Sequence, residues 1–193
     1  MPDDRPAVFL DRDGVINEEL NYVHRIEDFH FLPGVLAACR ELSQAGYLLV
    51  VITNQAGIAR GYYDVAQFEA LTVWMKRQFS EAGAPLAGVY YCPHHPEGKV
   101  EEYRKECACR KPAPGMLLQA QRELGIDFGR SILVGDKLSD IEAGRAVGVG
   151  RYFLISHASS SLAAPEDVPA CKRVTSLSEV VELIRPQTDS LRN

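Results

Sequence analysis

Residues 8–19, VFLDRDGVINEE, place two aspartates, Asp11 and Asp13, directly after a short apolar run near the amino terminus. Burying carboxylates costs several kcal/mol unless something pairs with them. Core packing alone therefore does not explain this stretch. The two aspartates indicate a ligand site at the end of a buried strand.

Similar apolar runs recur along the chain, separated by longer segments of helical period. We expect strands at residues 7–10, 47–52, 88–92, 131–135 and 151–155, and helices at residues 35–46, 64–83, 115–125 and 138–148. Asp64 is the expected N-cap of the second helix. Strands that alternate with helices predict an α/β fold of Rossmann type, with a doubly wound open parallel sheet and flanking helices.

The length of 193 residues fits one domain, which at this size buries roughly 70% of the unfolded surface. We expect a single domain over residues 1–185, with a Ser/Ala/Pro-rich loop at 156–169 and a C-terminal tail at 186–193. Only about forty residues separate Asp13 from Thr53, and a helix and a strand take most of them. The sequence therefore predicts no large cap domain.

The charge and hydropathy of the chain exclude several classes of partner. A net charge of -5 provides no basic field for a nucleic-acid backbone or an anionic membrane. The longest apolar run, YLLVVI, is too short to span a bilayer, and MPDDRP leads into a strand without a signal-peptide core. We expect a cytoplasmic protein, a monomer, that binds a small molecule.

Three expected strands end in polar residues, which would meet at the carboxyl edge of the sheet. Asp11 and Asp13 are two residues apart in extended chain, so both can face the crevice while Arg12 points away. Asp136 reaches the same edge from another strand. Three carboxylates without an evident basic partner would repel one another, which predicts a Mg²⁺ ion between them.

A phosphate site is expected beside this metal. Thr53 offers a hydroxyl and Asn54 an amide at the end of the second strand. Lys111 precedes a helix amino terminus, whose free N–H groups favour anions. A lone D-x-D pair also fits a turn with a helix cap, but it does not account for these additional groups. Asp140 fits either a further metal-side carboxylate or a helix cap.

Four motifs, FLDRDGVIN, VITNQ, the lysine of CRKPAPG and LVGDKLSD, resemble in order those of the haloacid dehalogenase (HAD) superfamily of phosphohydrolases. The resemblance covers residues 7–150. More narrowly, DRDGVIN, TNQAGIARG, CPHHPEG, CACRKPAPGML and GDKLSDIEAG are similar to the heptose bisphosphate phosphatases. The phosphatase half of histidine-biosynthesis enzymes is a close relative of these.

The resemblance implies a role for each residue at the sheet edge. Asp11 would be the nucleophile that forms an aspartyl-phosphate, and Asp13 the general acid and base. Thr53 and Lys111 would hold the transferring phosphoryl oxygens. The ligands of the Mg²⁺ ion would be Asp11, Asp136 and the backbone carbonyl of Asp13.

The loop at 92–109 carries a second candidate metal site. Three thiols and an imidazole, at Cys92, Cys107, Cys109 and either His94 or His95, suit a closed tetrahedral Zn²⁺ site. The related phosphatases carry such a loop, and their pattern selects His94. Because the loop has little apolar material, zinc would be structural. The other two cysteines, Cys39 on the apolar face of a helix and Cys171 near a late strand, are expected to be ordinary buried thiols.

Specificity would come from three short loops that surround the crevice. By resemblance, the candidate substrate contacts are Glu19, Leu20, Asn21, Tyr22, Asn54, Gln55 and Arg60. Arg110, next to the zinc loop, and Lys137 could provide a pocket for a second anion. Tyr22 fits equally well as packing over the sheet edge, and Arg60 as a solvated charge.

Three functions remain open from the sequence. The favoured one is a Mg²⁺-dependent phosphatase that removes the C7 phosphate of a D-glycero-D-manno-heptose 1,7-bisphosphate, in ADP-heptose and lipopolysaccharide core precursor synthesis. A histidinol-phosphate phosphatase is the alternative enzyme, for which Glu18 or Glu19 would bind the amine. A catalytically inactive, zinc-stapled binding module is the alternative of another class, although it would have no reason to keep both Asp11 and Asp13.

Overall fold

The computed structural model describes residues 4–156 and 171–185. Six parallel strands form one sheet in the order β3-β2-β1-β4-β5-β6. Their bounds are β1 Ala7–Leu10, β2 Leu48–Asn54, β3 Leu86–Cys92, β4 Ile132–Gly135, β5 Arg151–Ile155 and β6 Cys171–Val174. The strand order reverses between β1 and β4, which is where an open parallel sheet binds its ligand.

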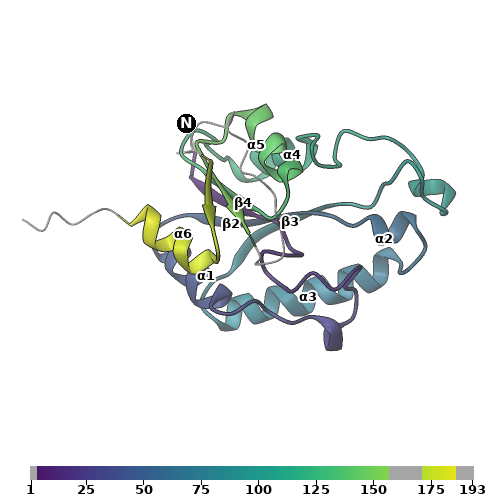
Figure 1. Cartoon of the computed structure of the whole chain (residues 1–193), viewed down its shortest axis with the longest axis horizontal. Helices are drawn as coiled ribbons and strands as arrows, with labels where there is room; N and C mark the ends of the chain where they lie inside the picture. Colours follow the sequence, from purple (N-terminus) through teal and green to yellow (C-terminus); the bar gives the residue numbers. More distant parts are fainter. Residues whose placement is uncertain (1–3, 157–170, 186–193) are drawn as a thin grey trace, which may run out of the picture.

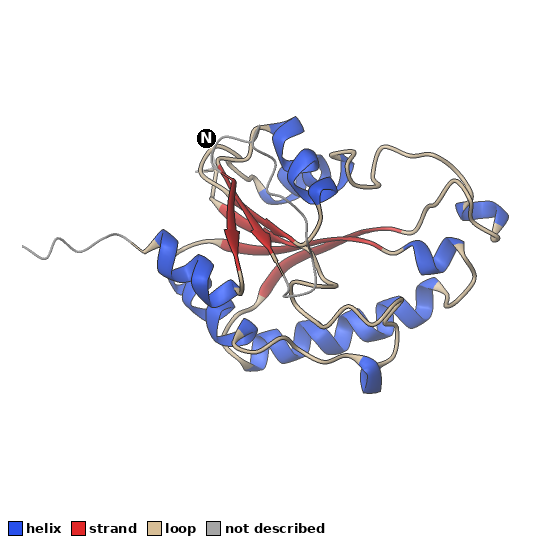
Figure 2. Ribbon diagram, in the orientation of Figure 1, coloured by secondary structure: helices blue, strands red, loops and turns tan. Residues whose placement is uncertain are grey.

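Helices cover both faces of the sheet (Figures 1 and 2). The helices are α1 Val35–Gln44, α2 Ala56–Ala59, α3 Val65–Glu81, α4 Gly115–Leu124, α5 Leu138–Val147 and α6 Leu177–Ile184, with 3-10 turns η1 Ile26–Asp28 and η2 Glu101–Tyr103. Helices α1, α3 and α6 lie on one face, and α4 and α5 lie on the other. The predicted doubly wound α/β fold is therefore confirmed.

Strand β1 lies between two layers of helices, and its sequence is a continuous run of apolar residues. All four of its residues are fully buried. Val8 and Leu10 pack with the residues of α1, α3 and α6, whereas Ala7 and Phe9 pack with those of α4 and α5. Alternate side chains point to opposite faces of a strand, so a strand between two helical layers has no polar face.

The expected elements are present with small shifts at their ends. Strand β2 runs on through Thr53 and Asn54, and β3 begins at Leu86. The predicted cap of α3 is confirmed, because Asp64 Oδ1 accepts a hydrogen bond from the Gln67 backbone N–H at 2.8 Å.

Helix α6 and the short α2 are absent from the sequence-based expectations, whereas β6 is the late strand expected near Cys171. The start of α6 does carry a signal: Ser176 Oγ accepts from the Glu179 backbone N–H at 3.3 Å, in the spacing of a capping box. The predicted loop over 156–169 lies almost wholly outside the described residues, and the predicted tail at 186–193 lies wholly outside them.

The connection from β1 to β2 contains only η1 and α1, so no cap domain is inserted there, as predicted. The connection from β3 to α4 is longer and extends beyond the sheet on the side of α2 (Figure 1). Two of its N–H groups, those of Lys99 and Val100, donate to the Ala59 carbonyl of α2 at 2.7 and 2.9 Å. This loop and α2 are therefore joined beside the carboxyl edge of the sheet.

Candidate active site and zinc-loop metal centre

A buried lysine joins two carboxylates at the carboxyl edge of the sheet. The Lys111 ammonium lies 3.0 Å from Asp11 Oδ1 and 2.7 Å from Asp140 Oδ1. It also donates to the Ile52 carbonyl at 2.9 Å. Burial lowers the pKa of Lys111, but the charges of Asp11 and Asp140 raise it by more, so the ammonium remains charged. Lys111 is thus fixed beside the expected nucleophile.

Asp13 is held by donors to both of its oxygens. The Arg12 guanidinium donates to Oδ1 at 2.8 Å and to Oδ2 at 2.9 Å, and also to the Val23 carbonyl at 2.7 Å. Asn17 Nδ2 donates to Oδ1 at 3.0 Å, and Gln55 Nε2 to Oδ2 at 3.2 Å. The carboxylate therefore has one fixed orientation at the rim of the cavity.

The prediction that the acidic cluster lacks basic partners is wrong. Lys111 pairs with Asp11, and Arg12 pairs with Asp13. Arg12 can reach its neighbour because β1 ends at Leu10 and the chain turns there, with the Ile16 N–H donating to the Arg12 carbonyl at 2.8 Å. The geometry of an extended strand, assumed for residues 11–13, does not continue past Leu10.

Asp136 follows β4 and completes a group of three carboxylates with Asp11 and Asp140. One oxygen from each of the three lies within 4.8 Å of the others. Asp136 Oδ1 is buried and has no hydrogen-bond partner among the described residues. Burial raises the pKa of Asp11 to about 7, although Lys111 opposes it, and burial raises the pKa of Asp136 to about 6, although Lys137 opposes it. A divalent cation fits here, because it would satisfy the bare oxygen and stabilise the ionised forms.

Gly14 allows the segment after β1 to lie close to Asp136, which follows β4. Its φ is +83°, and a Cβ added there would lie 2.4 Å from Asp136 Oδ2. Only glycine combines that backbone conformation with that space. Gly14 therefore lies directly against Asp136. The residue before it, Asp13, carries the backbone carbonyl that is an expected metal ligand.

Asp140 caps α5, one of the two alternatives for this residue. Its Oδ2 accepts from the Lys137 backbone N–H at 3.0 Å, while its Oδ1 meets Lys111. Both oxygens thus have partners in the protein. Asp140 orients Lys111 and the start of the helix, and it also belongs to the three-carboxylate group.

A cavity of about 620 Å³ opens over these groups. Of the predicted residues, it is lined by Asp11, Asp13, Glu19, Asn21, Tyr22, Asn54, Gln55, Arg60, Arg110, Lys111 and Lys137. Leu20 does not line it and is 50% exposed. Thr53 is also absent from the lining; it is buried, and Gln55 Nε2 donates to Thr53 Oγ1 at 2.8 Å.

The cavity also has walls that sequence reasoning did not assign to a substrate site: Ala56, Tyr63, His95 and Ser139. Ala56 directly follows Gln55, and Ser139 lies two residues after Lys137, so their proximity in the chain was a usable signal. His95 was considered only as a zinc ligand. Tyr63 lies just before a helix and carries no local signal of its position.

The cations of the cavity differ in their partners. Lys137 lies 3.2 Å from Glu19 and 3.7 Å from Asp136, so carboxylates already neutralise much of its charge. Arg60 and Arg110 have no carboxylate within ion-pair distance among the described residues. Arg60 lies 3.2 Å from His95 Nε2, and Arg110 donates to the His94 carbonyl at 3.3 Å. These two arginines therefore carry the uncompensated positive charge of the cavity.

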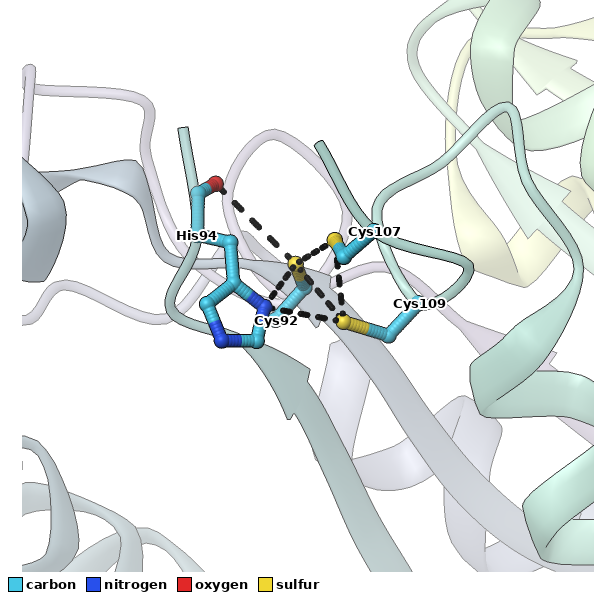
Figure 3. A group of neighbouring side chains, drawn as sticks. All are labelled: Cys92, His94, Cys107 and Cys109. Carbon is cyan, nitrogen blue, oxygen red and sulfur yellow. Dashed lines mark hydrogen bonds between the residues drawn. The ribbon is translucent and has the colours of Figure 1, made fainter. Parts of the chain in front are cut away.

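The predicted zinc ligands cluster in the loop after β3. Figure 3 shows the sulfurs of Cys92, Cys107 and Cys109 and the ring of His94 facing one another. The sulfurs lie 3.0 to 3.4 Å apart, and His94 Nδ1 lies 3.3 Å from Cys109 Sγ and 3.8 Å from Cys92 Sγ. No disulfide forms among them. Around tetrahedral Zn²⁺, with bonds of about 2.3 Å, neighbouring sulfurs lie about 3.7 Å apart, so this donor set fits the ion.

The cluster contains His94 and not His95, which contacts Arg60 instead, so His94 remains the candidate ligand that the family pattern implies. The loop is also fixed at its other end. Gly115, the first residue of α4, donates to the Ala108 carbonyl at 2.8 Å, and a Cβ at Gly115 would lie 2.3 Å from that oxygen. The segment that carries Arg110 and Lys111 is thus held between the cluster and α4.

In the part of the chain that the structure describes, no helix has the length and apolar character needed to cross a bilayer. This finding agrees with the short apolar runs of the sequence.

Comparisons with known proteins identify the family. A family model described as HAD-hydrolase-like matches residues 108–170. The D-glycero-beta-D-manno-heptose-1,7-bisphosphate 7-phosphatase of Escherichia coli (strain K12) is 55% identical over 150 residues, which cover 78% of both chains. The D-glycero-alpha-D-manno-heptose-1,7-bisphosphate 7-phosphatase of Photorhabdus laumondii is 44% identical over 176 residues, covering 91% of this chain and 96% of the relative.

A solved structure gives the same result. The D,D-heptose 1,7-bisphosphate phosphatase from B. bronchiseptica, complexed with magnesium and phosphate, matches with a TM-score of 0.76 and 32% identity. The match covers 92% of this chain and 97% of that one. With this agreement in sequence and fold, the protein belongs to the heptose-1,7-bisphosphate 7-phosphatase family of HAD-like hydrolases.

Proposed function

We propose that this protein is a Mg²⁺-dependent phosphatase that removes the C7 phosphate of D-glycero-D-manno-heptose 1,7-bisphosphate, on the route to ADP-heptose and lipopolysaccharide core precursors. The observation that carries the bisphosphate is the pair of uncompensated arginines, Arg60 and Arg110, in the same cavity as Asp11 and Lys111. A substrate with one phosphate beside Asp11 and Lys111 and a second phosphate at Arg60 and Arg110 would neutralise the positive charge at both places.

In the first step, a carboxylate oxygen of Asp11 attacks phosphorus, and the bond from phosphorus to the C7 oxygen breaks. Asp13 gives its proton to the departing sugar oxygen. Lys111 and Thr53 hold the phosphoryl oxygens, where charge accumulates in the transition state. The products of this step are heptose 1-phosphate and an aspartyl-phosphate.

In the second step, Asp13 takes a proton from a water molecule, whose oxygen attacks the same phosphorus. The bond to Asp11 breaks, inorganic phosphate leaves, and Asp13 is again protonated for the next substrate. Asp11 and Asp136 would hold Mg²⁺ together with the Asp13 carbonyl. When bound, the ion would supply positive charge to the carboxylates and the phosphoryl oxygens.

Zn²⁺ would have a structural role at Cys92, His94, Cys107 and Cys109. It would fix the loop that presents His95 and Arg110 to the cavity, and Lys111 follows directly. No reactive role is proposed for it, because four protein ligands complete its coordination.

Histidinol phosphate fits this cavity less well. It has one phosphate and a cationic amine, so it would bring positive charge toward Arg60 and Arg110. Glu19, the acidic residue that could bind the amine, already pairs with Lys137.

The proposal on the second phosphate is tested by comparing the bisphosphate with histidinol phosphate in the wild type and in Arg60→Gln. Losing a charge-assisted contact of about 1.5–3 kcal/mol would raise the KM for the bisphosphate by roughly 10- to 100-fold. Arg130→Gln, an exposed arginine away from the cavity, is the matched control. A wild-type preference for histidinol phosphate, or an unchanged KM in Arg60→Gln, would contradict the assignment.

A further inference from the structure

Tyr63 is a buried tyrosine whose hydroxyl faces the active site and has no role in the mechanism above. It lies between α2 and α3, is 5% exposed, and lines the cavity. Its hydroxyl donates to Gln55 Oε1 at 2.5 Å. Burial raises the pKa of Tyr63, so the hydroxyl keeps its proton. Because a carbonyl oxygen carries no hydrogen, Tyr63 must be the donor in this pair.

This contact determines which end of the Gln55 amide faces the catalytic groups. Gln55 Nε2 lies 3.2 Å from Asp13 Oδ2 and 2.8 Å from Thr53 Oγ1. Asp13 Oδ2 also accepts from the Arg12 guanidinium at 2.9 Å, so this oxygen faces donors and the amide nitrogen belongs on that side. If the amide turned over, its oxygen would face the Asp13 carboxylate and the Tyr63 hydroxyl would lose its acceptor.

The chain of hydrogen bonds also sets the direction of the Thr53 hydroxyl. Both hydrogens of the Gln55 amide are used, one on Asp13 and one on Thr53. Since the Thr53 oxygen accepts, its own proton remains for another acceptor. Thr53 is the residue proposed to donate to the transferring phosphoryl group, and it needs that free proton to do so.

The surroundings of Tyr63 leave its ring little freedom to move. The ring of His24 stacks on it, with centroids 4.9 Å apart and planes 8° apart. A Cβ at Gly57 would lie 2.1 Å from Tyr63 Cε1, so only glycine makes room for the ring there. His24 is itself anchored, since its Nδ1 lies 2.8 Å from the Tyr22 carbonyl. The hydroxyl is thus held at one place relative to Gln55.

We propose that Tyr63 is a positioning residue that acts through Gln55, orienting the general acid and base Asp13 and the phosphoryl ligand Thr53 together. This inference rests on the proposed phosphatase reaction and adds to it a residue that does not touch the reacting atoms. The effect of Tyr63 therefore passes entirely through the Gln55 amide.

The test is a double-mutant cycle with Tyr63→Phe, Gln55→Ala and the double variant, all assayed with Mg²⁺ and heptose 1,7-bisphosphate. Tyr63→Phe keeps the ring and removes the hydroxyl. We expect it to lower kcat roughly tenfold, the effect of one buried hydrogen bond, while KM changes less than about twofold. In the Gln55→Ala background the same change should cost less than about twofold, because no amide is left to orient.

Tyr62→Phe is the matched control, since Tyr62 is 51% exposed and its hydroxyl has no hydrogen bond within the described part of the chain. Thermal melting of each variant checks that it is folded. An unchanged kcat in Tyr63→Phe, or an undiminished loss in the Gln55→Ala background, would overturn the inference. A rise in KM as the main effect would overturn it too, since Tyr63 would then bind substrate directly.

Failure of the proposed function gives a different result. A wild-type enzyme inactive on the bisphosphate overturns that function, and the same cycle is then measured on 4-nitrophenyl phosphate, which needs no sugar recognition. Inactivity of the wild type on both substrates would overturn both proposals.

Discussion

Arg12 contacts both Asp13, the proposed general acid and base, and the aromatic core. It is 1% exposed, and its guanidinium lies 6.0 Å from the ring centres of both Phe29 and Phe68 while it binds Asp13. A guanidinium can form a planar bidentate pair and stack on rings at once, which an ammonium cannot. Arg12 therefore joins Asp13, the proposed general acid and base, to the rings of Phe29 and Phe68.

We predict that Arg12→Lys lowers the free energy of unfolding by about 1–3 kcal/mol and kcat by roughly 10- to 100-fold, because the charge remains but the bidentate contact is lost. Denaturant unfolding and steady-state kinetics measure the two effects. The control is Arg77→Lys in the exposed pair with Glu81, which should leave the free energy of unfolding and kcat nearly unchanged because solvent screens that pair. Equal, small effects at both sites would contradict the role of Arg12.

The sequence predicts which residues gather at the site far better than it predicts how their charges pair. Asp11, Asp13, Lys111 and Asp136 each follow a recognisable strand or precede a helix, so their meeting at one edge is foreseeable. Their pairing depends on tertiary distances of a few ångströms. For that reason the contact of Lys111 with Asp11 and Asp140 could not be predicted.

At the scale of elements, the loop after β3 joins the candidate zinc ligands to the proposed substrate cavity. Its four candidate zinc ligands, its contact with Ala59 and its contact with Gly115 hold a segment that lacks a core of its own. Loss of the metal should thus release Arg110 and the neighbouring Lys111 together.

We predict that Cys107→Ser releases zinc, lowers the melting temperature and lowers kcat/KM for the bisphosphate by more than about 100-fold. Metal analysis, thermal melting and kinetics measure these effects. Cys171→Ser in β6, outside the cluster, should keep its zinc and its activity. Full activity in a zinc-free Cys107→Ser protein would show that the loop needs no metal.

The predictability of an element depends on how much of its signal is local. Helix α3 was predictable from its long amphipathic pattern and its Asp64 cap. Helix α6 has eight residues, and its cap residues Ser176 and Glu179 were the main signal. Such short elements are stabilised chiefly by packing, here against α1, and packing is not visible in a local pattern.

At the scale of the whole molecule, the acidic site opposes folding and a bound cation would offset this cost. The pKa values of Asp11 and Asp136 are raised from 3.8 to about 7 and about 6. At pH values between 3.8 and about 7, the folded protein without Mg²⁺ therefore binds more protons than the unfolded chain. Its stability therefore falls as the pH rises through this window.

We predict that Mg²⁺ raises the melting temperature of the zinc-loaded protein more at about pH 8 than at about pH 5, because protons compete with the ion at the lower pH. Asp136→Asn should remove most of this Mg²⁺-dependent gain. An equal gain at both values of pH, or a larger one in acid, would contradict a carboxylate site for the ion.

The fold class followed from the alternation of strands and helices, but the strand order did not. Six strands can be arranged in many orders, and only the long-range packing places β4 next to β1. In a parallel sheet the carboxyl ends of all strands lie at the same edge, whatever the order of the strands. The polar residues at those ends were therefore predicted to meet there without knowledge of the strand order.

The most direct test of the central claim is the identity of the phosphate removed. Purified protein with Mg²⁺ is incubated with D-glycero-D-manno-heptose 1,7-bisphosphate, and phosphorus NMR follows both phosphates in the wild type and in Asp11→Asn. We predict loss of the C7 phosphate, accumulation of heptose 1-phosphate, and no turnover by Asp11→Asn. Release of the C1 phosphate, or sustained turnover by Asp11→Asn, would contradict the account.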